Sequence, residues 1–172
     1  MPWLTTDELN FVDALQSLDL NANTSCFPCR TVNMGRYDSM VAIVNVGAGS
    51  TYRIWVNCAS TVTGITSGSS GNLVPFTYRV SGSAANASTA DTLGTRSSTV
   101  TTTGTISTSG YSHDGTTSPN VSIYVEVKND NVPQGFPYVA VSISTAAQAH
   151  PASVNYVMKP RYPQNTMMIG GS

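Results

Sequence analysis

Three adjacent side chains around residue 113 are of the types that perform nucleophilic hydrolysis. Ser112, His113 and Asp114 supply a nucleophile, a general base and a carboxylate in consecutive positions. In a working triad the histidine lies in space between the other two groups, which immediate neighbours in a chain rarely achieve. The tripeptide also lies in a segment rich in Gly, Thr and Ser, where such strings arise from composition alone. We therefore expect no catalytic role for it.

The three cysteines could support redox or zinc chemistry. Cys26 and Cys29 have the C-x-x-C spacing found in thiol–disulfide oxidoreductases and in zinc sites. In the redox motif a following helix lowers the thiol pKa, whereas here a β-prone stretch follows. A structural zinc site needs four ligands, and the remaining candidates, Cys58, His113 and His150, form no second paired motif. We expect a turn that carries reduced thiols, with no metal and no cofactor.

Other signatures of catalysis are missing from the sequence. It contains no P-loop, G-x-S-x-G, H-E-x-x-H or dinucleotide-binding glycine pattern. Gly47 and Gly49 precede no predicted helix, so this glycine pair lacks the helix N-terminus that would hold a phosphate. Carboxylates for glycoside hydrolysis are also scarce after Asp38. The sequence therefore predicts a protein that is not an enzyme.

The composition limits the remaining classes of function. The chain has 172 residues, a formal net charge of -1 and 10% charged residues, and about a quarter of it is Ser or Thr, well above ordinary use. Without an excess of basic residues, sequence-independent binding to nucleic acid is not expected. No apolar run approaches the roughly 20 residues that cross a bilayer, and the hydrophobic content is too high for a disordered chain. What remains is a neutral, β-rich domain of a kind common in assembled structural proteins.

The first residues differ from the rest and predict a short helix. Thr5 and Glu8 have capping-box spacing, and Phe11, Leu15 and Leu18 follow at i, i+4 and i+7. We expect residues 1–25 to form a helical arm that docks either on its own domain or on another chain. No basic n-region and no continuous apolar stretch precede this pattern, so no secretory signal is expected.

Six segments after residue 31 have the β-branched, alternating character of strands, with turn residues between them. Because no helical segment separates them, they predict an all-β, antiparallel β-sandwich, either jelly-roll or immunoglobulin-like, over residues 26–160. The turn at residues 47–50 predicts that the first two strands form a hairpin, and Pro75 indicates an edge or a bulge. The six segments are residues 40–46, 51–58, 73–80, 121–127, 138–144 and 153–158.

Residues 82–120 form a Ser/Thr-rich segment with very few charges. A structureless loop of this length is improbable in a compact domain. The segment is therefore either a flexible insertion or a β segment that pairs with another subunit, and its β-branched threonines favour pairing.

Both ends of the chain carry candidate contacts with other subunits. Trp3 is hard to bury locally and is the best single candidate for an intermolecular anchor, because aromatic side chains dominate interface energetics. Residues 161–172 form a proline-punctuated tail. Lys159, just before this tail, and Arg161, beside Tyr162, could pair with carboxylates of the arm. The candidate contact residues are Trp3, Phe11, Leu15, Leu18, Lys159, Arg161 and Tyr162.

Two stretches of the chain resemble a family of phage proteins. Residues 31–47 have an Asn33-Met34 pair, then Tyr37, an apolar strand and a glycine; residues 124–143 contain Pro137-Tyr138-Val139, and an Arg161-Tyr162 pair follows. This pattern is similar to small virion proteins encoded near the head genes of tailed bacteriophages. The resemblance implies a β-rich decoration or cement protein that is commonly trimeric and binds the major capsid protein over subunit junctions.

The expected function follows from this resemblance. We expect a protein of the capsid surface that is made in the host cytoplasm and acts through inter-subunit contacts. Two alternatives remain: a fibre- or adhesin-like module that binds glycans through exposed aromatics, and a head–tail connector or tail component.

Overall fold

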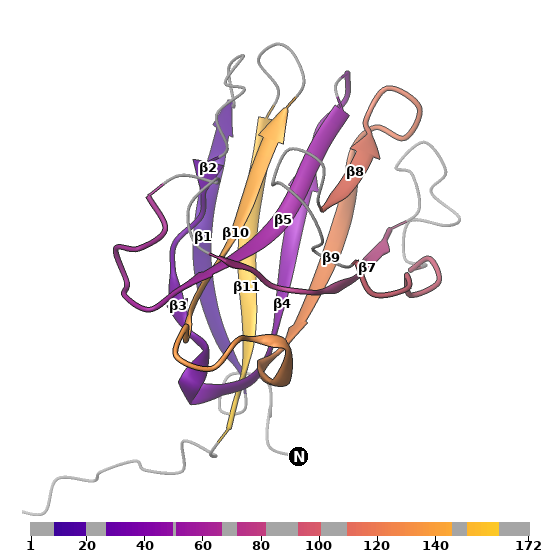
Figure 1. The fold of residues 1–172 in the computed structure, drawn as a ribbon. Coiled ribbons are helices and arrows are strands. Elements are labelled where there is room, and N and C mark those ends of the chain that lie inside the picture. Colours follow the sequence, from indigo (N-terminus) through magenta and orange to yellow (C-terminus); the bar gives the residue numbers. More distant parts are fainter. Residues whose placement is uncertain are drawn as a thin grey trace, which may run out of the picture.

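The computed structural model describes residues 9–19, 27–49, 51–66, 72–81, 93–100, 110–145 and 151–161. They form two antiparallel sheets packed face to face (Figure 1). Sheet A contains, in spatial order, β1 (Asn10–Asp19), β11 (Pro151–Pro160), β4 (Tyr37–Val46), β9 (Val121–Lys128) and β7 (Thr77–Val80). Sheet B contains, in order, β2 (Phe27–Pro28), β10 (Tyr138–Thr145), β5 (Thr51–Ala59) and β6 (Asn72–Leu73); β3 (Val32–Asn33) also pairs with β10, and β8 (Tyr111–Asp114) with β5. The predicted antiparallel β-sandwich is confirmed.

The strand order is that of a jelly roll. We count β2 with β3 as one strand, count β6 with β8 as one strand, leave out β7, and number the resulting eight strands in chain order. Sheet A then has the order 1-8-3-6 and sheet B the order 2-7-4-5, and β7 extends the edge of sheet A. Consecutive strands β4 and β5 lie in different sheets, so the predicted hairpin at residues 47–50 is wrong: this turn crosses from one sheet to the other.

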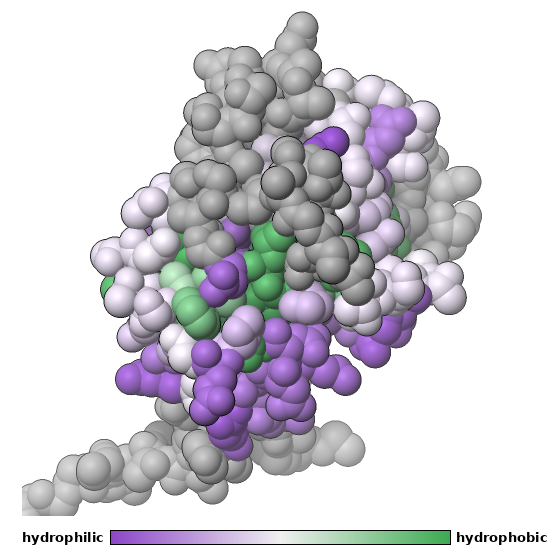
Figure 2. Space-filling view, in the orientation of Figure 1, coloured by the Kyte–Doolittle hydropathy of each residue, from purple (hydrophilic) through white to green (hydrophobic). Residues whose placement is uncertain are grey.

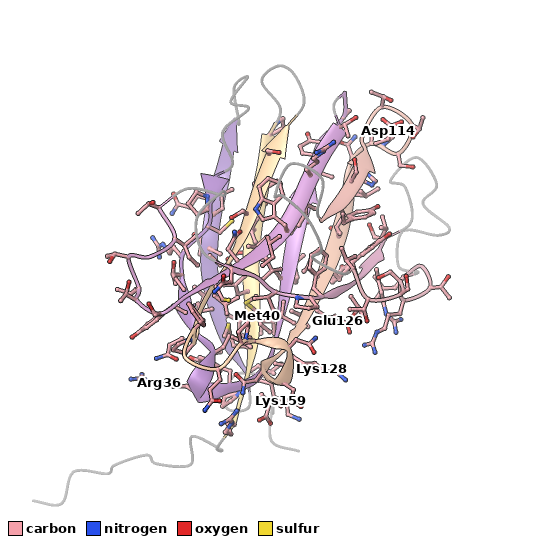
Figure 3. All side chains as sticks on the ribbon, viewed as in Figure 1. Arg36, Met40, Asp114, Glu126, Lys128 and Lys159 are labelled. Carbon is pink, nitrogen blue, oxygen red and sulfur yellow. The ribbon has the colours of Figure 1, made fainter. Side chains whose placement is uncertain are left out.

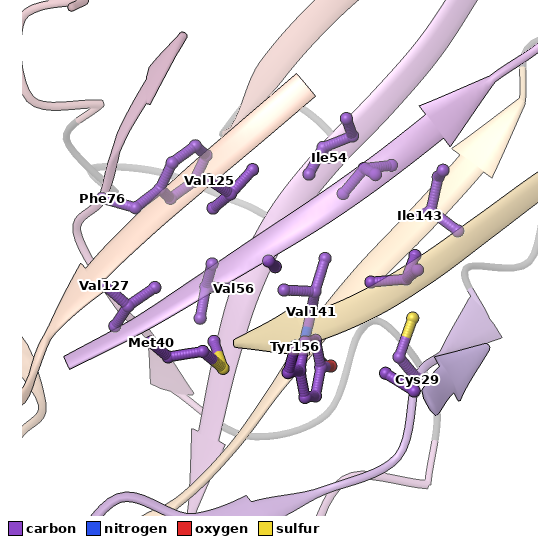
Figure 4. Packing of buried hydrophobic residues seen from close by; sticks show 14 of the residues in the cluster. Cys29, Met40, Ile54, Val56, Phe76, Val125, Val127, Val141, Ile143 and Tyr156 are labelled. Atoms are coloured by element: carbon purple, nitrogen blue, oxygen red, sulfur yellow. Dashed lines mark hydrogen bonds between the residues drawn. The ribbon is translucent and has the colours of Figure 1, made fainter. Parts of the chain in front are cut away.

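The strands form because their side chains alternate between the core and solvent. Along β9, the four valine and isoleucine side chains at every second position are at most 3% exposed, and β4 and β11 show the same pattern. Burying each such side chain stabilises the fold by about 1.5–3 kcal/mol. The core seen in Figure 4 includes Met40, Ile54, Val56, Phe76, Val125, Val127, Val141, Ile143 and Tyr156.

The two sheets are connected in different ways at the two edges of the sandwich. At one edge the Cys29 amide donates to Val141 in sheet B, and the next amide, of Arg30, donates to Ala14 in sheet A, both at 2.9 Å. At the other edge the chain crosses between sheets at Pro75, between β6 and β7. The predicted single strand over residues 73–80 is therefore wrong: Pro75, expected at an edge or a bulge, separates two strands of different sheets.

The N-terminal helix predicted from the sequence is wrong over the described residues. Asn10–Asp19 form strand β1, which pairs antiparallel with β11. Val12 and Ala14 face the core, whereas Phe11 and Asp13 are exposed on the opposite side. This alternation is the two-residue period of a strand.

A β-bulge explains why the spacing looked helical. The register of β1 shifts between Asp13 and Leu15, so one extra residue turns Leu15 toward the core together with its neighbour. A second shift follows before Leu18. The two bulges break the strand period and leave apolar residues three and four apart, as on a helix. The predicted capping box at Thr5 and Glu8 lies outside the described residues.

The described parts of the Ser/Thr-rich segment pair within the chain. Residues 93–100 run beside β7, with backbone bonds from Gly94 to Val80, Ser97 to Tyr78 and Val100 to Phe76. Strand β8 pairs with β5. Residues 82–92 and 101–109 lie outside the described residues. The predicted boundaries of the arm at residue 25 and of the tail at residue 161 stay predictions.

Two 3-10 turns, η1 (Met34–Arg36) and η2 (Asn129–Asn131), lie at the same end of the sandwich (Figure 1). Within the ranges given above, no helix is long and apolar enough to cross a membrane.

Candidate functional site

Cys29 and Cys58 lie inside the sandwich. Cys29 is 4% exposed and lies beside Tyr156 in the core (Figure 4). Burial raises the pKa of Cys29 to about 12 and that of Cys58 to about 11. Both cysteines are free, and both thiols are protonated at neutral pH, which makes them poor nucleophiles and poor metal ligands. Cys26 lies outside the described residues.

Tyr156 links the two sheets next to these thiols. It is fully buried on β11, and its hydroxyl accepts a hydrogen bond of 2.9 Å from the backbone N–H of Val141 on β10. Burial raises the pKa of Tyr156 well above its usual value, so the hydroxyl stays neutral. This contact is structural and leaves no free group for chemistry.

The Ser112-His113-Asp114 tripeptide does not form a triad. It lies on β8, where His113 is buried and its two neighbours are exposed on the other face. The Nε2 atom of His113 lies 2.8 Å from the carbonyl oxygen of Ser118 and must donate to it, so a neutral ring accepts from Tyr111 at Nδ1, 3.2 Å away. His113 is therefore a core histidine with both nitrogens satisfied.

The carboxylate of Asp114 is hydrogen-bonded within its own loop. It accepts hydrogen bonds from the backbone N–H of Thr116, at 2.9 Å, and from the hydroxyls of Thr116 and Thr117. The Thr116 hydroxyl contributes most to lowering the pKa of this carboxyl group. Among the described residues, no group of three His, Cys, Asp or Glu side chains is placed to hold a metal ion.

The outer face of sheet A is exposed and partly apolar. Because Met40, Ala42 and Val44 point into the core, Val41 and Ile43 between them point outward. Across neighbouring strands the same face carries half-buried Val157 and Tyr124, and Phe11, which is 61% exposed. We call this surface the open face; it comprises Phe11, Asp13, Val41, Ile43, Thr77, Arg79, Tyr124, Glu126, Asn155 and Val157.

The outer face of sheet B differs because it is covered. Trp55, Asn57 and Ser142 point away from the core on this side, yet each is at most 2% exposed. The Ser142 hydroxyl donates to the Asn57 side-chain oxygen at 2.8 Å, and Ile65 packs on Ala59 and Ala140. Only sheet A, of the two sheets in the described part of the chain, therefore offers a broad face to a partner.

A second exposed surface lies at the end that carries η1 and η2. Four of the eight basic residues gather there: Arg36, Lys128 and Lys159, which Figure 3 labels, and Arg161. We call this surface the basic end. Lys128 and Lys159 flank Ser39 in register, and the Arg161 amide donates to the Arg36 carbonyl at 3.0 Å. Arg161 also lies 3.8 Å from Asp38. Hydrophilic residues dominate this end in the space-filling view (Figure 2).

A shallow depression of about 290 Å³ lies at the opposite end of sheet A. Its lining includes Asn45, Asn120, Ser122 and Ser153. Asn45 lies in the middle of a polar row: its amide donates to the Ser153 hydroxyl at 3.1 Å, and its side-chain oxygen accepts from the Ser122 hydroxyl at 2.7 Å. Tyr124 follows Ser122 on the same face of β9.

The structure separates the contact residues predicted from the sequence. Phe11 lies on the open face, whereas Lys159 and Arg161 belong to the basic end, and Leu15 packs partly on the core. The backbone of Leu18 pairs opposite Ala152. Trp3 and Tyr162 lie outside the described residues. Arg161 lies 3.8 Å from Asp38, and the expected pairing of Lys159 and Arg161 with arm carboxylates stays a prediction.

Sequence reasoning missed most of the open face. The alternation within residues 39–45 and 153–159 identifies which side chains point away from the core. It does not show that β11, β4 and β9 are neighbours, because that depends on pairings between distant segments. The comparisons with known proteins do not supply this either, since no family model, curated protein or solved structure matches the chain.

Proposed function

We propose that this chain is a virion structural protein that binds the outside of a phage capsid and stabilises it, as a decoration or cement protein. It would be made in the host cytoplasm and act without catalysis, through contacts with the major capsid protein and with copies of itself. The observation that carries the proposal is the contrast between the buried reactive groups and the exposed surfaces. Among the residues that the structure describes, Cys29, Cys58 and His113 are buried, whereas two surfaces suited to contacts are exposed.

The basic end is the surface that we assign to the capsid. Four exposed cations there outnumber the nearby described carboxylates, Asp38 and Asp130. Exposed charges of one sign steer association with a surface of the opposite sign and set the orientation of binding. The strand register also brings the start of β1 and the end of β11 to this end, since Asn10 pairs opposite Met158. Jelly rolls are frequent in viral capsid proteins, although a fold alone does not decide function.

Co-sedimentation of the full chain with purified capsid shells tests this proposal. We expect saturable binding that weakens with salt, since exposed charges are screened. Arg36→Glu should weaken binding by about tenfold, because one attractive charge becomes repulsive. Arg30→Glu makes the same change at an exposed position away from the basic end and serves as the matched control. Absence of binding by the unmodified chain would refute the proposal.

A glycan-binding module is the second candidate, and the depression beside Asn45 favours it. Amide and hydroxyl groups line it without charge, and Tyr124 offers an aromatic ring nearby. Small-molecule sites commonly combine an apolar wall with a few placed polar groups. A glycan array tests this candidate: binding that is lost in Asn45→Ala and Tyr124→Ala would support it over capsid attachment.

A further inference from the structure

The open face has a regular arrangement of side chains in two rows across the five strands of sheet A. Strand register places residues of successive strands directly opposite one another. In both rows an aliphatic residue of β4 occupies the centre. One row is Phe11, Val157, Val41, Glu126 and Thr77; the other is Asp13, Asn155, Ile43, Tyr124 and Arg79.

Opposite charges lie at the two edges of this face. At the β1 edge, Asp13 is exposed and has no ion pair with any described residue. At the β7 edge, Arg79 and Arg96 share a single carboxylate, that of Glu126, so one cation is in excess. The Nε atom of Arg79 is buried, lies 3.7 Å from Glu126 and makes no hydrogen bond. The face is therefore negative at the β1 edge and carries an excess positive charge at the β7 edge, and between them Val157, Val41 and Ile43 are apolar.

A twofold axis parallel to β4 converts this asymmetry into complementarity. A rotation of 180° about this axis places the β1 edge of one copy opposite the β7 edge of the other. Each row keeps its position along the strand direction. Asp13 would then oppose Arg79 of the partner subunit, and the same contact would occur a second time by symmetry. Ile43 and Val41, on the axis strand, would meet their own copies. This is the self-complementary pattern of an isologous interface.

We propose that the open face binds the open face of a second copy of this chain about this twofold axis. The two faces would pack as aligned sheets about 10 Å apart, as the sheets of a sandwich do. Five strands at about 4.8 Å spacing, over the three to four residues that the two rows span, give a face of roughly 300 Å² on each copy. Two such faces total about 600 Å², less than the roughly 1,200–2,000 Å² of standard interfaces, so the pair should be weak and dependent on concentration.

The rest of the described surface favours this choice of occupant. The outer face of sheet B is covered, and both edges of sheet A are partly covered, by the bond from Arg30 to Ala14 on β1 and by residues 93–100 beside β7. Association through a strand added to sheet A is therefore disfavoured at these positions, whereas its outer face stays accessible. The twofold pair takes the place of the trimer that the phage resemblance implied.

Measurement of mass in solution across a dilution series tests the pairing. We expect the full chain to exist as a dimer in equilibrium with monomer. Asp13→Lys and Arg79→Asp should each weaken dimerisation by about tenfold or more, because each reverses two contacts in the symmetric pair. Asp130→Lys and Arg30→Asp make the same changes outside the open face and should leave the equilibrium unchanged. Circular dichroism and thermal melting verify that each variant is folded.

Mixing the two variants provides the sharper test. Each variant alone places like charges together at both edges of the pair. A mixed pair of Asp13→Lys with Arg79→Asp has opposite charges at both edges, so mixing should restore dimers. Because Arg79 also contacts Glu126, Ile43→Lys provides a variant that leaves this ion pair intact, and it should abolish dimers by placing two cations on the axis.

A chain that is monomeric at every concentration, or trimeric, would overturn the pairing. So would a dimer that is insensitive to these variants, or one that mixing does not restore. The measurement uses the chain without capsids, whereas the test of the proposed function uses the basic end and capsid shells. Failure of either proposal therefore leaves the other to be decided by its own experiment.

Discussion

The hydroxyl of Tyr156 in sheet A accepts a hydrogen bond from the backbone N–H of Val141 in sheet B. The bond forms where the partner strand of β10 is interrupted: β2 pairs with Ser142 and Ile143, and β3 pairs with Tyr138 and Val139. Between these two short ladders, the side chain of Tyr156 takes the place of a backbone acceptor. A core phenol thus completes a sheet that the neighbouring strand leaves incomplete.

Tyr156→Phe should therefore destabilise the fold by about 1–3 kcal/mol, because it leaves a buried N–H without an acceptor. Urea unfolding measures the change. Tyr124→Phe removes the same atom from a half-buried side chain on the open face and should alter stability little. Equal stability of the two variants would show that the cross-sheet bond is unimportant.

The buried thiols predict a loss of stability at high pH. Folding raises the pKa of Cys29 to about 12 and of Cys58 to about 11, against an unfolded value of 9.0. The stabilisation is fully present below pH 9, where both states are protonated. Above pH 9 only the unfolded chain releases these protons, so stability falls by up to about 1.4 kcal/mol per pH unit for each thiol. Denaturant unfolding from pH 8 to 11 measures the fall.

The double variant Cys29→Ala/Cys58→Ala should flatten this fall between pH 9 and 10. Tyrosines contribute separately at higher pH, since burial raises the pKa of Tyr111 to about 12. An unchanged pH profile in the double variant would mean that the thiols do not set it.

Cys29 and Cys58 should also resist alkylation in the folded protein. At pH 8 the folded chain has almost no thiolate at either position, because both pKa values lie far above 8. Peptide mapping after iodoacetamide treatment gives the labelling rate at each cysteine, and the unfolded chain in urea is the reference. Rates equal to that reference would contradict the buried placement.

His113→Ala should reduce stability by about 1–3 kcal/mol, since it removes the partner of both Tyr111 and the Ser118 carbonyl. Ser112→Ala, at the exposed neighbouring position, should have little effect. Thermal melting distinguishes the two. The opposite ranking would suggest that the exposed side chains of β8 are the important ones.

Two glycines test the packing of backbone against backbone. Gly110 and Gly135 both have positive φ, 96° and 86°, so alanine is strained at either position. A Cβ at Gly110 would lie 2.5 Å from the carbonyl oxygen of Ile54, whereas nothing lies within 4 Å at Gly135. Gly135→Ala should cost about 1–2 kcal/mol, and Gly110→Ala about 1–3 kcal/mol more. Similar losses in both variants would argue against close packing at Gly110.

The strands with the clearest alternation are the part of this fold that a sequence predicts best. The segments at residues 40–46, 121–127 and 153–158 are strands because one side of each is buried. The prediction failed where local geometry breaks the period: bulges around Leu15 made a strand resemble a helix, and Pro75 divided one predicted strand between two sheets. The glycine turn after Val46 does not reveal that it joins different sheets, because a local turn signal carries no information on distant pairing.

The candidate site shows the same limit. The types and positions of Lys159, Arg161 and Phe11 predict that they are contact residues, and all three are exposed in the structure. The relation between Asp13 and Arg79 is not predicted in this way, because it depends on the register of five strands drawn from both ends of the chain.

That register also determines how the molecule responds to force. Asn10, at the start of β1, lies opposite Met158, near the end of β11, while Asp19 lies opposite Pro151. Tension applied between the two chain ends therefore separates this pair from one end, breaking its hydrogen bonds one after another rather than together. A small force applied through those two ends alone would therefore separate the strands. A force applied across the broad face of the sheet would load many hydrogen bonds at the same time, and a much larger force would be needed to break them.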